Sequence, residues 1–315
     1  MNKSEDKNSC VHIYGPVPSR RLGFSLGIDI IPFKTCTLDC IYCQLGPTTR
    51  KTIRRKEYFS SEEILAQIKM KLASGQRIDY ITFSGSGEPT LNTSIGKLIK
   101  EIKKITAIPV AVLTNSTLLS RKSVRNALLS ADFIVPSLDG VTQEVFVHIN
   151  RPHPSLKAEE IIEGLKKFRQ EFHGSMLLEI MLVKGINDSP VHIQKLKKVI
   201  SDIKPKRIQL NTVIRPPAEK FACSLSLMEL KKINKILGEK AEIIAKFDKK
   251  EQIPPSKNLE EAIFFMIKRR PVTLSDISAS LGKHKNEIIK YTNFLLEERK
   301  IKCVTHKGLK YYEPT

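Results

Sequence analysis

Two hydrophobic periods alternate along this chain. Short runs of apolar and β-branched residues, typical of buried strands, are separated by stretches in which apolar residues recur at three- and four-residue intervals, typical of amphipathic helices. The runs predict strands at residues 26–31, 80–84, 110–114, 133–137, 176–183, 207–212 and 242–247. The intervening stretches predict helices that begin near residue 60 and that cover about 94–104, 121–129, 156–172, 191–203 and 226–237.

Strands that alternate with helices form parallel sheets, because each helix returns the chain to the same edge by a right-handed crossover. Six such βα units predict an α/β fold, a partial (βα)6 barrel. The first helix shows the pattern: Ser60 and Glu63 have the spacing of a capping box, and Ile64 and Ile68 continue a buried face. In parallel barrels the functional loops follow the C-terminal ends of the strands.

The pattern changes near residue 250. Residues 251–257 contain two prolines and predict a linker, which separates a barrel over residues 1–250 from a small domain over residues 258–315. The small domain predicts three helices and a hairpin. This order resembles a winged helix-turn-helix, a module that contacts RNA or DNA or docks a protein. The residues on its expected recognition helix are His284, Lys285, Asn286 and Lys290.

The chain is strongly basic, with 53 Lys and Arg against 33 Asp and Glu and a net charge of +20. This excess is compatible with RNA or DNA bound through a basic surface, and equally with solvated lysine-rich helix faces. No stretch approaches the ~20 apolar residues of a membrane span, so no membrane partner is expected. The polar N-terminus lacks the apolar segment of a secretory signal, which predicts a cytoplasmic protein with reduced cysteines.

Half of the six cysteines lie close together. Cys36, Cys40 and Cys43 have the spacing C-x3-C-x2-C. Three thiolates suit a [4Fe–4S] cluster with one open iron, since a closed cluster normally takes four, and an open iron favours chemistry over simple electron transfer. A zinc site or three free thiols are the alternatives. Zinc usually takes a fourth Cys or His from a paired motif, and neither flank supplies one.

This spacing, with Tyr42 directly before the third cysteine, resembles the radical S-adenosylmethionine (SAM) superfamily. The resemblance implies that the open iron holds the amino and carboxylate groups of SAM. It implies that one electron from the reduced cluster releases a 5′-deoxyadenosyl radical, and that a low-potential donor such as ferredoxin or flavodoxin supplies it. Tyr42 would lie against the adenine. Nearby Arg20, Arg21 or Lys34 would favour reduction of the negatively charged cluster.

The second predicted strand ends in Gly85-Ser86-Gly87-Glu88-Pro89. Glycines allow a ligand to approach the backbone closely, and proline stiffens the turn. In radical SAM proteins the matching Gly-Gly-Glu-Pro stretch holds the methionine amino group. The resemblance therefore gives this role to Glu88, with Gly85 and Gly87 providing close approach. An ordinary βα turn is the alternative.

Polar groups also follow the later strands. Asn115 ends the third strand, and Ser137 and Asp139 end the fourth. The resemblance implies that they face the SAM ribose and carboxylate or the substrate, although each also suits a helix N-cap. It places Met181 or Val183 in the adenine pocket. The residues expected near the mouth of the barrel are Lys184, Asn187, Asn211 and Arg215.

Within the superfamily, the run from Tyr14 to Gly23 and the loop end Cys43-Gln44-Leu45-Gly46 are similar to a branch related to the wyosine-type enzymes, which build a tricyclic base on tRNA. The similarity covers about residues 10–247. Two features depart from those enzymes. Only Cys10 lies upstream, where they hold a second cluster, and no motif identifies the lysine that captures pyruvate.

Three hypotheses follow for the activity. The first is a radical SAM enzyme that modifies RNA recruited by the winged domain. The second is a radical SAM enzyme that acts on a protein or small metabolite, with the winged domain as a docking unit. The third is an iron–sulfur sensor that binds DNA without cleaving SAM.

Overall fold

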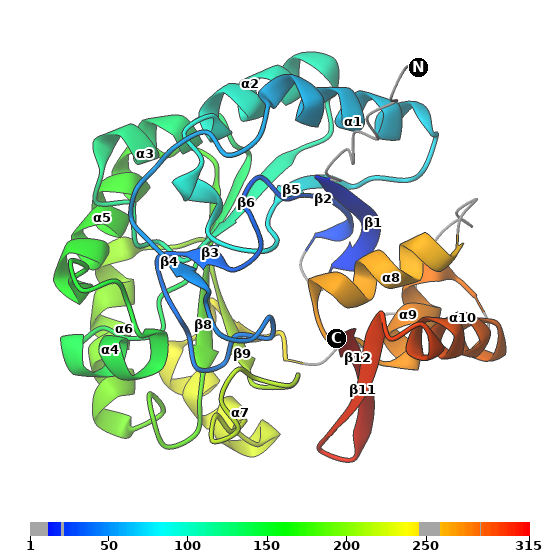
Figure 1. The fold of residues 1–315 in the computed structure, drawn as a ribbon. Coiled ribbons are helices and arrows are strands. Elements are labelled where there is room, and N and C mark those ends of the chain that lie inside the picture. The colour runs from blue at the N-terminus through cyan, green and yellow to red at the C-terminus, as the bar shows by residue number, and fades with distance from the viewer. Residues whose placement is uncertain (1–11, 20–21, 246–258, 284) are drawn as a thin grey trace.

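The large unit is built on an open, mostly parallel sheet. The computed structural model describes residues 12–19, 22–245, 259–283 and 285–315. Eight strands lie in the order β1-β2-β5-β6-β7-β8-β9-β10, so β1 and β10 form the two edges. The sheet curves and carries its helices on the outside (Figure 1). The strands are β1 (Ile13–Ser19), β2 (Gly23–Ile28), β5 (Tyr80–Phe83), β6 (Val110–Thr114), β7 (Phe133–Pro136), β8 (Ser175–Leu182), β9 (Arg207–Thr212) and β10 (Ala241–Ile243).

Every neighbouring pair of strands is parallel except β1 and β2. The predicted α/β class with a parallel sheet is therefore confirmed. The helices of the large unit are α1 (Ser61–Ala73), α2 (Ile95–Ile105), α3 (Lys122–Leu128), α4 (Gln143–Asn150), α5 (Ala158–Glu171), α6 (Pro190–Ile203) and α7 (Leu227–Leu237).

The sequence pattern does not predict β1 or α4. β1 contains Gly15, Pro16 and Pro18, which suit a strand interior poorly; it lies at the sheet edge, where proline is tolerated. α4 has eight residues, too few to show a full apolar period. β2 begins and ends three residues before the predicted strand 26–31. Residues 246–247 of the last predicted strand lie outside the described residues.

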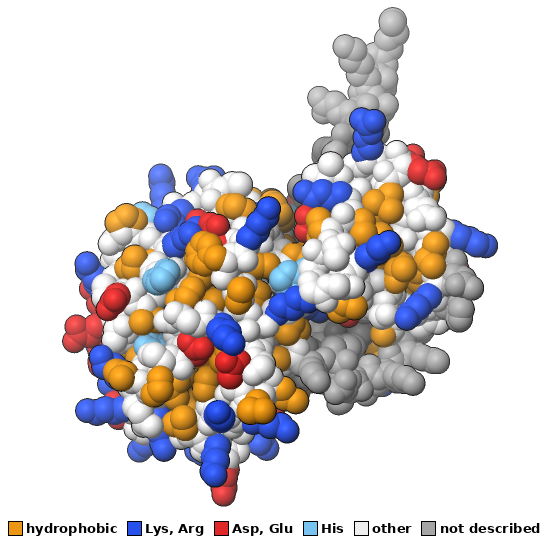
Figure 2. Space-filling view, turned by 90° about the horizontal axis from the view of Figure 1, so that it is seen from below, with side chains coloured by type: hydrophobic (Ala, Val, Ile, Leu, Met, Phe, Trp, Pro, Cys, Tyr) orange, Lys and Arg blue, Asp and Glu red, His pale blue; other side chains and the backbone are white. Residues whose placement is uncertain are grey.

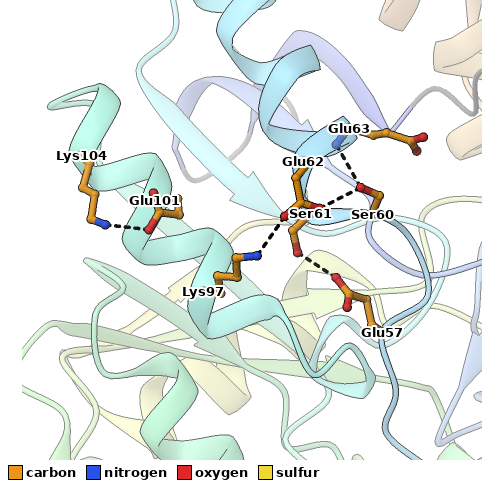
Figure 3. Close-up of polar contacts among 8 residues, drawn as sticks. All are labelled: Glu57, Ser60, Ser61, Glu62, Glu63, Lys97, Glu101 and Lys104. Atoms are coloured by element: carbon orange, nitrogen blue, oxygen red, sulfur yellow. Dashed lines mark hydrogen bonds and ion pairs between the residues drawn. The ribbon is translucent and has the colours of Figure 1, made fainter.

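Helices α1 and α2 show how the outer layer is held. Ser60 is the N-cap of α1; its Oγ accepts a hydrogen bond from the Glu63 amide at 3.3 Å and donates to Glu62 at 3.0 Å (Figure 3). Lys97 of α2 reaches the same Glu62 at 3.1 Å. Such exposed ion pairs add little stability. The side chains that fix α2 are those buried against the sheet, Ile95, Leu98, Ile99 and Ile102.

The C-terminal unit has a small apolar core of its own. Its elements follow the predicted order of three helices and a hairpin, and it forms a lobe beside the barrel (Figures 1 and 2). The predicted linker 251–257 lies outside the described residues. None of the helices described is long and apolar enough to cross a membrane. The elements are α8 (Leu259–Arg269), α9 (Leu274–Leu281), α10 (Lys285–Glu297), β11 (Ile301–His306) and β12 (Leu309–Pro314).

One end of this unit is joined to the first edge of the barrel. α8 and α9 both contact β1. Arg269, the last residue of α8, forms an ion pair with Asp29 directly after β2, and its guanidinium lies 4.0 Å from the centre of the Tyr14 ring in β1. Both side chains of the ion pair are largely buried.

The hairpin joins the same unit to the opposite side of the barrel. Lys307, at the hairpin turn, donates to the Val213 carbonyl at 3.1 Å and to the Ser224 hydroxyl. The Tyr311 hydroxyl donates to the Ile214 carbonyl at 2.9 Å. Because residues 213–224 follow β9, the C-terminal unit touches both sides of the gap that the open sheet leaves.

Candidate functional site

The three cysteines lie on one loop after β2, at the C-terminal end of the parallel strands, as predicted. Part of this loop, β3 (Thr35–Cys36), pairs with β4 (Arg50–Lys51) in a separate small sheet. Further along, the Asp39 amide donates to the Asn150 carbonyl at the end of α4, at 3.0 Å. The loop is therefore held by backbone hydrogen bonds on two sides.

Two of the cysteine sulfurs accept hydrogen bonds from asparagine side chains. Asn115 Nδ2 lies 3.4 Å from Cys36 Sγ, and Asn150 Nδ2 lies 3.3 Å from Cys40 Sγ. Asn115 was a predicted site residue, whereas Asn150 was not. Asn150 ends a helix that the pattern does not predict, and only the proline two positions later signals that end.

The third sulfur faces a buried lysine. Lys34 is 3% exposed, and its Nζ lies 3.2 Å from Cys43 Sγ. Among the described residues no carboxylate forms an ion pair with Lys34. A buried ammonium group without an anionic partner is costly. A thiolate or a negatively charged cluster at Cys43 supplies that partner.

Burial disfavours the thiolates in the protein chain alone. Burial, together with the nearby Glu88 carboxylate, raises the pKa of Cys36 to about 12. Burial and the Asp139 carboxylate raise the pKa of Cys40 well above its usual range. The thiolates therefore form when cationic iron displaces the protons.

The cysteine loop also fits a cluster better than a single ion. Within the part of the chain that the structure describes, no three His, Cys, Asp or Glu side chains are grouped as ligands of one metal ion. The ligands of a cluster attach to separate irons, so they need not be gathered in that way. Three half-buried cysteines, each with a nitrogen donor, match the ligands that a [4Fe–4S] cluster takes.

The structure brings the second predicted motif directly against the cysteine loop. The Lys34 amide donates to the Ser86 carbonyl at 2.8 Å, and the Glu88 amide donates to the Thr35 carbonyl at 3.2 Å. A Cβ atom on Gly87 would lie 1.9 Å from that Thr35 oxygen. Glycine is therefore required at this position for the two loops to touch.

Glu88 is 2% exposed, and its carboxylate is surrounded by donors. It accepts from the Thr90 amide at 3.1 Å and hydroxyl at 2.6 Å, from the Thr114 hydroxyl at 2.6 Å and from the Asn115 amide at 2.7 Å. Burial raises the pKa of Glu88, and these hydrogen bonds oppose the rise. Pro89 begins the short helix η1 (Pro89–Leu91). The carboxylate thus ties this loop to the end of β6.

Asp139 forms a second buried centre. Its carboxylate accepts from the Tyr42 hydroxyl at 2.5 Å, from Asn150 Nδ2 at 2.8 Å and from the Met181 amide at 2.9 Å. Burial raises the pKa of Asp139 to about 6, with these hydrogen bonds acting in the opposite direction. The residues that line one small internal cavity beside the cysteine loop include Asn115, Ser137, Asp139 and Asn150.

Tyr42 and Met181 pack into one apolar cluster, together with Val183. This places the residues predicted for the adenine pocket next to one another. The residues predicted near the mouth are in different surroundings. Lys184 is exposed and pairs with Glu229 at 3.0 Å. The residues that are buried instead are Asn187, Asn211 and Arg215.

Sequence comparison identifies the family that has this combination of fold and site. Residues 30–196 match the model described as the radical SAM superfamily. The chain belongs to the radical SAM superfamily. It is therefore an enzyme of that superfamily, and its cofactors are a [4Fe–4S] cluster and SAM.

Several relatives of this radical SAM enzyme are known. A UPF0026 protein of Methanocaldococcus jannaschii is 36% identical over 95% of this chain and 94% of its own length, so the chain also belongs to the UPF0026 family. A Brachyspira hyodysenteriae protein named GTPase Obg is 38% identical over 99% of this chain, but the chain spans only 46% of that protein. The dual-specificity RNA methyltransferase RlmN of Lawsonia intracellularis is 29% identical over 58% of this chain and 52% of its own length.

A solved structure shows the same fold. SuiB of Streptococcus suis, bound to S-adenosylmethionine, is similar with a TM-score of 0.53 and 16% sequence identity. The likeness covers 70% of this chain and 50% of that chain. At this level of identity it supports the radical SAM fold alone.

Proposed function

We propose that this radical SAM enzyme modifies an RNA and that Cys36, Cys40 and Cys43 hold its cluster. The observation that carries the cluster assignment is the set of three nitrogen donors, one at each sulfur, which come from separate parts of the fold. Donors of this kind stabilise negative charge on a cluster and tune its potential. When bound, the cluster supplies the electron that cleaves SAM to a 5′-deoxyadenosyl radical.

For the SAM pocket we assign a structural role to the loop from Gly85 to Pro89. Three donors reach Oε1 of Glu88, whereas among the described residues only the Asn115 amide reaches Oε2. A carboxylate oxygen offers about two lone-pair positions, so Oε2 keeps one for a further donor. Glu88 therefore shapes the loop through Oε1, and we propose that Oε2 and the loop carbonyl groups accept from the methionine amino group. Gly87 allows the loop to touch Thr35, and Gly85 allows it to pack against Asp29, so the two glycines fix the position of the loop.

The remaining predicted residues form the walls of the same pocket. Tyr42 and Met181 provide an apolar surface for the adenine, and the hydrogen bond from Tyr42 to Asp139 fixes the angle of its ring. Asn115 lies against Cys36, and Ser137 follows β7 at the same end of the sheet; their side chains offer both donors and acceptors to the ribose and carboxylate of SAM.

RNA is proposed as the substrate on three grounds. The chain carries a net charge of +20, and Lys and Arg outnumber Asp and Glu on the face in Figure 2. One relative is named an RNA methyltransferase. The C-terminal unit has the element order of a winged helix, and Lys285 and Lys290 are exposed on its third helix. A low-potential ferredoxin or flavodoxin is proposed as the electron donor.

We propose that the similarity to the wyosine-type branch concerns the barrel only. Tricyclic base formation is not proposed, because that chemistry needs further upstream cysteines and a lysine that captures pyruvate, and Cys10 is the only cysteine before Cys36. We therefore propose that the enzyme abstracts a hydrogen atom from an RNA, and we assign no class of product.

The test measures 5′-deoxyadenosine. The protein is reconstituted with iron and sulfide without oxygen, then given SAM and a strong reductant, with and without total cellular RNA. We expect formation of 5′-deoxyadenosine that RNA stimulates. Cys40→Ala should abolish it, whereas Cys303→Ala, at an exposed cysteine of the C-terminal unit, should not.

Two results would contradict the proposal. Formation that is unchanged by RNA but stimulated by a protein or metabolite fraction would assign a different substrate class. Absence of 5′-deoxyadenosine, despite an intact cluster and bound SAM, would favour the DNA-binding sensor.

A further inference from the structure

A line of exposed cations runs between the two loops of the site. Arg50, Lys51, Arg54 and Lys56 are all exposed and lie within seven residues of sequence; they are called the basic strip here. The strip begins at β4, which pairs with the cysteine loop, and it ends beside the loop that holds Glu88. It is therefore part of the surface around the site rather than of a distant helix face.

Backbone hydrogen bonds hold the basic strip in place. The Arg50 amide donates to the Lys34 carbonyl at 3.1 Å, and the Thr52 amide donates to the Cys36 carbonyl at 2.9 Å. At the other end, the Lys56 amide donates to the Leu91 carbonyl at 3.1 Å. Figure 1 shows the segment leaving β4 and passing in front of the sheet toward α1. The strip is thus an extended platform anchored at both loops.

The positive charge of the basic strip is not neutralised locally. Among the described residues, none of its four cations forms an ion pair with a carboxylate. The nearest acidic residue in sequence, Glu57, accepts from the Ser61 hydroxyl at 2.9 Å instead (Figure 3). Arg55, within the same segment, donates to main-chain carbonyls and has Arg121 as its charged neighbour. The local field is positive and lacks an internal counterion.

An exposed aromatic ring lies at the start of the basic strip. Phe33 is 50% exposed and directly precedes Lys34, whose carbonyl accepts from the Arg50 amide. It is the one large apolar side chain exposed between residues 29 and 60, all of which are described. An exposed ring beside a row of cations is typical of surfaces on which the bases of single-stranded nucleic acids stack.

We propose that the basic strip and Phe33 form a track for a single-stranded segment of RNA, which leads the target nucleotide to the cluster. The strip is extended and covers roughly 20 Å at about 3.3 Å per residue, the length of several nucleotides. Its cations contact successive phosphates, and Phe33 stacks on a base next to the cysteine loop. This inference rests on the proposed RNA substrate and deepens it by naming the surface.

A protein partner fits the same surface less well. Stable protein interfaces depend on a few buried apolar or aromatic anchors surrounded by a dry rim. The basic strip offers one exposed ring and a row of exposed cations, which suits a repeating polyanion. Two of the cations also contact the protein: Lys51 donates to the Arg151 carbonyl at 3.1 Å, and Lys56 lies 4.9 Å from the centre of the Tyr58 ring. Because the strip begins beside Cys36, we expect a flexible single strand rather than a rigid duplex, since a nucleotide must leave its stack to enter the barrel.

The test compares RNA binding by two variants that lose equal charge. A fluorescein-labelled, mixed-sequence single-stranded RNA of about 15 nucleotides is titrated with the reconstituted enzyme at several salt concentrations, and anisotropy gives Kd. In the first variant all four strip cations become glutamine. The matched control replaces four exposed lysines on and just after α7 by glutamine, Lys231, Lys232, Lys235 and Lys240. Iron content and circular dichroism establish that both variants are folded.

The strip variant should bind at least ~10-fold more weakly than the control, and the slope of log K against log salt should fall by about 2 to 3, since each lost phosphate contact on a single strand contributes about 0.7. Phe33→Leu should weaken binding roughly 5- to 100-fold without changing the slope, because stacking does not release counterions. The two variants thus report separately on charge and on stacking.

Three outcomes would overturn the track. These are equal losses of RNA affinity in the strip variant and the control, wild-type affinity in the strip variant, and competition by polyglutamate as effective as that by RNA at equal charge.

The proposed function is tested separately by 5′-deoxyadenosine formation. If RNA stimulates that reaction equally in the strip variant, the function stands and the track fails. If RNA binds the strip without stimulating the reaction, the strip is an RNA-binding surface, and the proposal that RNA is the substrate is wrong.

Discussion

Replacing Arg269 by leucine removes the cation that joins the C-terminal unit to the barrel. The side chains of Arg269 and Asp29 are 13% and 10% exposed. Removing one partner of a fully buried pair costs about 3–5 kcal/mol. Asp29 keeps three other donors, the Ser86 amide at 3.1 Å and hydroxyl at 2.5 Å and the Ile31 amide at 3.4 Å, which lowers the expected loss to about 2–3 kcal/mol. Loss of the contact with the Tyr14 ring adds up to ~1 kcal/mol.

The assay is urea-induced unfolding of the reconstituted enzyme. The chain has no tryptophan, so circular dichroism and tyrosine fluorescence follow the transition. Lys268→Leu is the matched control, because Lys268 is the exposed neighbour on the same helix. Combining Arg269→Leu with Asp29→Leu should recover part of the loss, since no buried carboxylate remains unpaired, and a coupling of at least ~1 kcal/mol is expected.

Because Asp29 also binds Ser86, the Arg269→Leu variant should bind SAM more weakly as well, measured by equilibrium dialysis. If Arg269→Leu changes the free energy of unfolding by no more than Lys268→Leu does, the ion pair does not stabilise the attachment of the C-terminal unit. The same conclusion follows if the double variant shows the simple sum of the two single losses.

Three further predictions concern the site. Gly87→Ala should lower the free energy of unfolding by at least ~3 kcal/mol and abolish SAM binding, because its Cβ would lie 1.9 Å from the Thr35 carbonyl oxygen. Gly75→Ala, where the new Cβ would meet no described atom within 4 Å, should lower it by only about 1 kcal/mol. Equal losses of stability in thermal unfolding would contradict this prediction. The pKa of Asp139 is raised to about 6, so the stabilisation that its protonated form provides is complete below pH ~4 and is lost as the pH rises through ~6. In the cluster-free protein, Asp139→Asn should remove this pH dependence of the free energy of unfolding, which amounts to up to about 3 kcal/mol. If the free energy of unfolding of the variant depends on pH as that of the wild type does, another group titrates. Lys34→Gln should lower the midpoint potential of the cluster by on the order of 100 mV, because a buried positive charge beside Cys43 is lost. Potentiometry followed by electron paramagnetic resonance measures the potential, and an unchanged midpoint would show that Lys34 does not favour reduction of the cluster.

Much of the architecture follows from local patterns. The alternation of apolar runs and helical periods predicts seven strands and the six helices between them, because burial on both faces of a parallel sheet leaves a near-continuous apolar run for each strand. The apolar pattern does not predict β1, because Gly15, Pro16 and Pro18 suit a strand only at the edge of a sheet. Whether a strand lies at an edge depends on the whole sheet. The C-terminal elements also follow from their own pattern, but their attachment to the barrel does not.

The cluster motif, the glycine-rich loop and the order of the βα units can be predicted from the sequence, because each depends on residues that are close along the chain. The fold alone determines which groups surround the sulfur atoms. Asn115 lies 79 positions from Cys36, and Asn150 lies 110 positions from Cys40. It also decided that Arg269, 240 positions away, joins Asp29 beside the glycine-rich loop. Contacts across such separations arise when elements that are far apart along the chain pack together, and no local period of the sequence records which elements these are.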